Sequence, residues 1–128
     1  MIHILIVDDN PDILDILRME LAENPAWKID TVTSAIEALQ ILQTAKYDVI
    51  ITDYMMPRMN GRDFLAAMRK QGLTASIILY SGRLDDAQEA LMKDLGAGAI
   101  IHRKGDPEVE FLALKKHIES VEKSDDPL

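Results

Sequence analysis

Short apolar stretches rich in β-branched residues alternate along the chain with longer stretches in which apolar residues recur every three or four positions. The short stretches predict strands and the longer ones predict amphipathic helices. The first stretch is apolar almost throughout, which is typical of a strand buried on both faces. The five predicted strands comprise residues 2–7, about 28–32, 49–52, 77–80 and 99–102.

Polar and special residues mark the predicted helix ends. Asn10 is placed as an N-cap, and Pro11 follows it at the first helical position, where an N–H is not needed. Ser34 and Glu37 have the spacing of a capping box. The apolar side of that second helix is predicted to carry Ile36, Leu39 and Leu42.

Later helix boundaries are marked by glycine and proline. Gly72 is placed to end the third helix, and Gly96 to end a fourth that begins near residue 84. A fifth helix is predicted to begin near Pro107. Its core face is predicted to carry Phe111, Leu114, Ile118 and Val121, and that of the first helix Ile13, Leu14, Leu17 and Leu21.

Five βα units in 128 residues predict one α/β domain, a three-layer sandwich with a parallel sheet between two layers of helices. The domain is expected to comprise residues 1–122. Residues 123–128 are expected to form a polar tail or the stump of a linker.

Composition excludes several functional classes. The chain has 14 Lys and Arg against 22 Asp and Glu, a net charge of -8, and no basic cluster, so direct nucleic-acid binding is not expected. The absence of cysteine removes disulfides and thiolate metal sites and is compatible with the cytoplasm, the expected location. No run of about 20 apolar residues predicts a membrane helix, and no membrane contact is expected.

Polar residues follow four of the five predicted strands directly. In open α/β sheets, ligands bind at the carboxyl ends of the strands. If the first and third strands are neighbours, three carboxylates converge there, and hard oxygen ligands of this kind suit Mg²⁺. The residues concerned are Asp8, Asp9, Asp53, Ser81, Arg103 and Lys104.

Each of these residues taken alone also has a purely structural explanation. An acid after a strand commonly caps a helix, Asp53 precedes a turn at Pro57, and basic residues usually lie on the surface. Their shared position at the strand ends favours a functional site over four separate structural roles.

Four segments carry a resemblance to a known family: residues 4–10, 53–61, 81–82 and 95–97. Together they resemble the receiver domain of two-component response regulators, a chemotaxis-protein-like fold. The resemblance implies a flavodoxin-like sheet with strand order 2-1-3-4-5. It also implies that Asp53 accepts a phosphoryl group from the phosphohistidine of a histidine kinase or from a small phosphodonor.

The resemblance assigns further roles. It implies that Mg²⁺ or Mn²⁺ is held by Asp8, Asp9, Asp53 and the backbone carbonyl of Met55. Asp9 would bind the metal directly and Asp8 largely through water. The Ser81 hydroxyl and the Gly82 N–H would bind phosphoryl oxygens. The domain would not be an enzyme, because it assists only its own phosphorylation and dephosphorylation.

The chain departs from the family pattern at two positions. The family has a lysine, usually followed by proline, after the fifth strand. The ungapped register places Arg103 there, and a one-residue bulge would bring Lys104 there instead, so both stay open. A switch aromatic in the fifth strand is replaced by Ile100, or by Ile101 in the shifted register.

The sequence also bears on output and on alternatives. Output is expected through a partner protein or through an effector or kinase region outside these residues, and a phosphorylation-linked homodimer fits the resemblance. Met55 cannot orient an attacking water, which predicts a long-lived phosphoryl form.

A degenerate receiver that serves as an unphosphorylated docking or dimerisation module is the alternative to this function. A haloacid-dehalogenase-type phosphatase would need a second acid at position 55.

Overall fold

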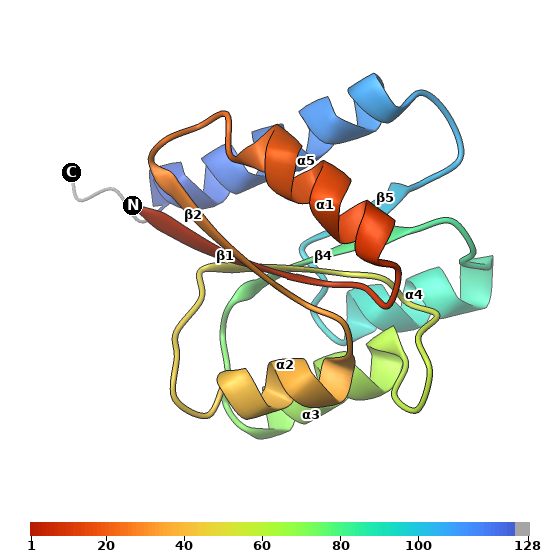
Figure 1. Ribbon diagram of the computed structural model, residues 1–128. Helices are drawn as coiled ribbons and strands as arrows, with labels where there is room; N and C mark the ends of the chain where they lie inside the picture. Colours follow the sequence, from red (N-terminus) through yellow and green to blue (C-terminus); the bar gives the residue numbers. More distant parts are fainter. Residues whose placement is uncertain (125–128) are drawn as a thin grey trace.

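The computed structural model describes residues 1–124. Strands and helices alternate along the chain, as the sequence predicts (Figure 1). In chain order the elements are β1 (Ile2–Val7), α1 (Pro11–Leu21), β2 (Trp27–Val32), α2 (Ala35–Ile41), β3 (Val49–Thr52), α3 (Gly61–Lys70), β4 (Ser76–Ser81), α4 (Asp86–Asp94), β5 (Ala99–His102) and α5 (Pro107–Ser124).

The five strands form one parallel sheet in the order β2-β1-β3-β4-β5, which confirms the expected flavodoxin-like topology. Figure 1 shows α1 and α5 on one face of the sheet and α2, α3 and α4 on the other. Each face has its own apolar core, because successive residues of a strand point to opposite faces. None of the helices in residues 1–124 is long and apolar enough to cross a membrane.

The helix ends follow the predicted chemistry in part. The Asn10 side chain accepts from the N–H of Asp12, and the Ser34 hydroxyl accepts from the N–H of Glu37. The predicted buried side of α2 is wrong at Ile36, which is 40% exposed, because Ala35 and Ala38 turn inward instead. Seven residues give two turns, too few for a broad apolar stripe.

Two boundaries near the carboxyl half differ from the sequence prediction. α4 begins at Asp86, after a capping box formed by Asp85 and Gln88, rather than near residue 84. α5 continues through Ser124, two residues into the segment expected to be a tail. Residues 125–128, the rest of that expected tail, lie outside the described residues.

Candidate functional site

Acidic residues from two neighbouring strands meet at the carboxyl edge of the sheet. β1 and β3 pair in a register that sets Val7 beside Thr52, so the acids that follow these strands are also neighbours. One carboxylate oxygen from each of Asp8, Asp9 and Asp53 lies within 4.8 Å of the others. The predicted convergence of the three acids is therefore present in the structure.

Asp53 is held firmly at the end of β3. Its N–H donates to the carbonyl of Val7 across 3.2 Å, which extends the sheet pairing by one residue. One carboxylate oxygen accepts the N–H of Tyr54 at 2.8 Å. The residue is 8% exposed, so its other oxygen faces the edge of the sheet from a fixed, largely buried position.

Asp8 is the more deeply buried of the first two acids, at 3% exposure, whereas Asp9 is exposed. The two carboxylate oxygens of Asp8 accept from the N–H of Asn10 at 2.9 Å and from the Arg103 guanidinium at 3.2 Å. Burial raises the pKa of Asp8, and the negative charge of Asp53 adds to this. The Asn10 N–H and the Arg103 charge offset part of that rise in pKa. The cluster therefore favours added positive charge.

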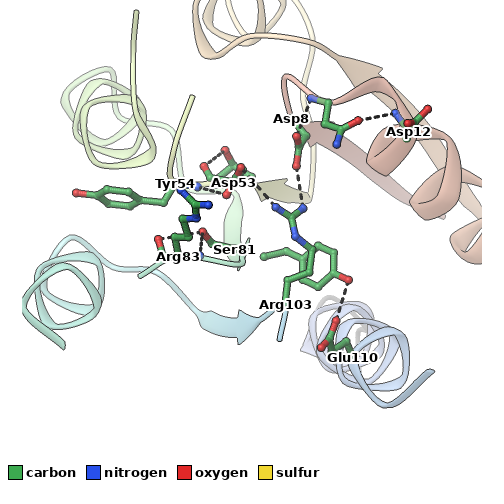
Figure 2. Close-up of polar contacts among 11 residues, drawn as sticks. Asp8, Asp12, Asp53, Tyr54, Ser81, Arg83, Arg103 and Glu110 are labelled. Carbon is green, nitrogen blue, oxygen red and sulfur yellow. Dashed lines mark hydrogen bonds and ion pairs between the residues drawn. The ribbon is translucent and has the colours of Figure 1, made fainter. Parts of the chain in front are cut away.

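Arg103 is the basic residue that enters the site. β5 pairs regularly with β4 up to His102, and the Arg103 N–H donates to the Ser81 carbonyl at 2.8 Å. One guanidinium nitrogen bonds Asp8, and another lies 3.7 Å from a carboxylate oxygen of Asp53 (Figure 2). Lys104 is exposed, and its backbone N–H is turned toward Glu110. The side chain in the cleft is thus that of the ungapped register.

The other wall of the site comes from the end of β4. Ser81 is buried, and its hydroxyl oxygen is 3.4 Å from the N–H of Arg83, which donates to it. Met55 lies at the rim, and the residue is 56% exposed. A cavity of about 300 Å³ opens here, lined by Asp53, Met55, Ser81, Gly82, Arg83 and Arg103.

The loop after Asp53 returns close to its own start. The Gly61 N–H donates to the carbonyl of Tyr54 at 2.7 Å. A Cβ atom at Gly61 would lie 2.9 Å from the Tyr54 Cα and 3.0 Å from the Asp53 carbonyl oxygen. Only glycine permits this approach, which holds the loop against the start of α3.

Two residues beside the site were not identified from the sequence. The Tyr80 hydroxyl donates to the Glu110 carboxylate at 3.1 Å, and the ring centroid of Tyr80 lies 5.2 Å from the Arg103 Cζ. Burial and the bond to Glu110 raise the pKa of Tyr80 to about 12. A signal for Glu110 was available: it lies four residues before Leu114 and eight before Ile118, on the buried stripe of α5.

The acid cluster fits a divalent cation of the hard type. Its donors are carboxylate oxygens on two adjacent loops, one of them solvent-exposed, and such sets suit Mg²⁺ with water in the remaining positions. Their mutual repulsion, seen in the effect of Asp53 on the pKa of Asp8, is what a metal ion would relieve. Asp8, Asp9 and Asp53 could hold such an ion.

Residues 4–115 match the family model of the response regulator receiver domain. The response regulator SaeR of Staphylococcus aureus is 33% identical over 107 residues, which are 84% of this chain and 46% of that protein. The chain thus spans about half the length of this curated relative.

Solved structures show the same fold. The receiver domain of Francisella response regulator 1452 superposes with a TM-score of 0.87 at 22% identity, covering 98% of this chain and all of that one, a likeness of fold alone. The Vibrio cholerae chemotaxis protein CheY4 gives 0.80 at 28% identity, over 92% and 98% of the two chains. The Thermotoga maritima response regulator TrrA, solved in complex with Mg²⁺-BeF, gives 0.80 at 29% identity, over 94% and 99%.

Proposed function

The chain belongs to the response regulator receiver domain family, and on that basis we propose that it is a phosphorylation-dependent switch whose phosphoacceptor is Asp53. The observation that carries the proposal is the placement of Asp53. Its carboxylate lies at a strand end between two further acids and the guanidinium of Arg103, beside a cavity large enough for a phosphoryl group. Membership of the family implies signalling by phosphorylation.

The proposed reaction transfers a phosphoryl group to the carboxylate. An oxygen of Asp53 attacks the phosphorus, a new O–P bond forms, and the P–N bond of a phosphohistidine or the P–O bond of an acyl phosphate breaks with its electrons on the leaving group. Such transfer depends on an in-line nucleophile and on positive charge around the phosphoryl oxygens. A carboxylate nucleophile needs no general base.

The surrounding residues supply the positive charge and the donors. A divalent cation on Asp8, Asp9, Asp53 and the Met55 carbonyl would offset the repulsion between carboxylate and phosphoryl group. We assign phosphoryl contacts to the Arg103 guanidinium, the Ser81 hydroxyl and the Gly82 N–H. Ser81 and Gly82 line the cavity beside Asp53, and Arg103 is already within 3.7 Å of its carboxylate.

The partners follow from the family. The proposed phosphodonor is a histidine kinase, or a small acyl phosphate in its absence. The relative SaeR is about twice as long as this chain, so output is proposed to pass to a partner protein or a further region, with a phosphorylation-linked homodimer as one form of it. We propose that the domain catalyses no reaction beyond its own phosphorylation and dephosphorylation, and that it acts in the cytoplasm.

Intact-mass measurement tests the proposal directly. Incubation with Mg²⁺ and acetyl phosphate is expected to add the mass of one phosphoryl group, and removal of the metal with EDTA is expected to suppress the addition. Asp53→Asn should abolish it, whereas Asp63→Asn, which changes an exposed acid on α3, should not. A wild-type chain that gains no mass with any phosphodonor would favour the unphosphorylated docking module instead.

A further inference from the structure

We propose that Tyr80 and Glu110 are positioning residues that hold the Arg103 guanidinium between Asp8 and Asp53. The role in phosphorylation that this gives them rests on the function proposed above. In the ungapped register Arg103 takes the place of the family's lysine, and Lys104 stands where a proline usually follows, so no proline fixes the loop after β5.

Glu110 is the anchor of that loop. One of its carboxylate oxygens accepts two backbone N–H groups, from Lys104 at 3.2 Å and from Gly105 at 2.9 Å. Its other oxygen accepts the Tyr80 hydroxyl. The residue is only 8% exposed, and burying a carboxylate is costly unless donors compensate it. All three donors are supplied by β4 and by the two residues that follow Arg103.

Tyr80 joins this anchor to Arg103. Its hydroxyl is fixed by Glu110, and its ring lies under the guanidinium at 5.2 Å, within the range of a cation–π contact. Figure 2 shows Glu110 on α5 near Arg103, and marks the contacts of the Arg103 guanidinium with Asp8 and Asp53. The flat face of arginine suits such a ring in a way that the ammonium of lysine does not.

Arg103 is therefore restrained at three points. Its backbone N–H bonds the Ser81 carbonyl, the loop that follows it is tied to Glu110, and its guanidinium rests on the Tyr80 ring. A long arginine side chain that is free in solution loses rotamer freedom when it is fixed on a ligand. Ordering it in advance leaves less entropy to lose when a phosphoryl group arrives.

Paired substitutions at position 110 test the proposal. Glu110→Leu removes the acceptor, whereas Glu110→Gln keeps one oxygen for the two loop N–H groups. The leucine variant is expected to be phosphorylated by acetyl phosphate about tenfold more slowly, and the glutamine variant within about twofold of wild type. Glu108→Leu is the matched control, because it removes an exposed acid from the same first turn of α5.

Repeating the Glu110 substitution in a variant that lacks Arg103 distinguishes a positioning role from a merely structural one. In an Arg103→Met background, Glu110→Leu should slow phosphorylation by less than about twofold, because the residue through which it acts is absent. An equal slowing in both backgrounds would overturn the proposal. If Glu110→Leu does not fold, Tyr80→Phe serves in the same pair of backgrounds, since it removes only the hydroxyl that joins ring and carboxylate.

A second readout needs no phosphorylation. The NMR order parameter of the Arg103 Nε–H bond should approach the value of rigid backbone, about 0.85, in the wild type and fall below about 0.6 in Glu110→Leu. An unchanged order parameter would contradict the positioning role. A wild-type chain that is never phosphorylated would instead contradict the proposed function, while the NMR comparison would still decide whether Glu110 orders Arg103.

Discussion

The Arg103 guanidinium donates to the Asp8 carboxylate across 3.2 Å, joining two residues that are 95 positions apart in the chain. Asp8 follows β1 and Arg103 follows β5, so the bond spans the carboxyl edge of the sheet. The oxygen that it uses belongs to one of the three acids proposed to hold a metal ion. A metal ion bound by these acids would therefore compete with the guanidinium for negative charge in the unphosphorylated protein.

Replacing Arg103 by methionine is expected to tighten Mg²⁺ binding to the unphosphorylated chain. Loss of a competing charged hydrogen bond worth about 1.5 kcal/mol corresponds to a gain in affinity of about tenfold. Calorimetric titration with Mg²⁺ measures this, with Arg62→Met as a control that removes an exposed charge elsewhere. Weaker binding in the Arg103 variant would show that the guanidinium supports the metal site rather than competing with it.

The phosphoryl form is expected to be long-lived. The exposed Met55 side chain at the rim of the cavity has no group that can orient a water for attack on the phosphorus. After the phosphodonor is removed, intact mass followed over time should show a decay over minutes or longer, and Met55→Asn should shorten it severalfold. Loss of the phosphoryl group from the wild type within seconds would contradict this prediction.

Alkali is expected to destabilise the fold between about pH 10 and pH 12. The Tyr47 hydroxyl donates to the Asp30 carboxylate at 2.7 Å, as the Tyr80 hydroxyl does to Glu110. Burial, together with these carboxylates, raises the pKa of Tyr47 and of Tyr80 to about 12. Both phenols ionise near pH 10 in the unfolded chain but near 12 in the folded one, so their contribution to stability is complete below pH 10 and is lost through that window. Urea unfolding across this range measures the slope, and Tyr47→Phe with Tyr80→Phe should flatten it.

Gly61→Ala is expected to lower the free energy of unfolding by about 1–3 kcal/mol, because its Cβ would meet backbone atoms that cannot move independently. Chemical denaturation measures the loss. Gly105→Ala is the control, since the nearest atom to its added Cβ is the Glu110 carboxylate at 3.8 Å, an ordinary contact. Equal losses in both variants would mean that crowding at Gly61 is not the cause.

The sheet and the acid cluster could be predicted because each rests on a local signal. Apolar runs of strand length predicted the order of the elements. A polar residue directly after a parallel strand lies at the carboxyl edge of the sheet, whatever the conformation of the following loop. The ungapped count favours Arg103 over Lys104, which the sequence left open, and Arg103 is the side chain that lies in the cleft because β5 pairs with β4 without a bulge.

The Tyr80–Glu110 pair could not be predicted in the same way. Charged residues are assigned to the surface by default, and the burial of Glu110 depends on donors from other elements: the Tyr80 hydroxyl, 30 residues away on β4, and two N–H groups of the loop after β5. The prediction for Ile36 was wrong for the opposite reason. This apolar residue was assigned to the buried face of α2, but two alanines occupy that face. The spacing of Glu110 to Leu114 and Ile118 indicated the buried side of α5. The donors that a buried acid finds, and the side chains that fill the inward face of a helix, depend on tertiary packing, which short-range periodicity does not contain.

The shared carboxylate of Glu110 has a consequence for protein engineering. Converting this chain to the family's usual lysine by changing position 103 alone would replace the planar guanidinium over the Tyr80 ring by a compact ammonium and leave a buried acid still tied to the loop. The side chains at positions 80, 103 and 110 therefore depend on one another, and none should be substituted alone. Grafting the site into another scaffold, or reverting it, requires that they be transferred together.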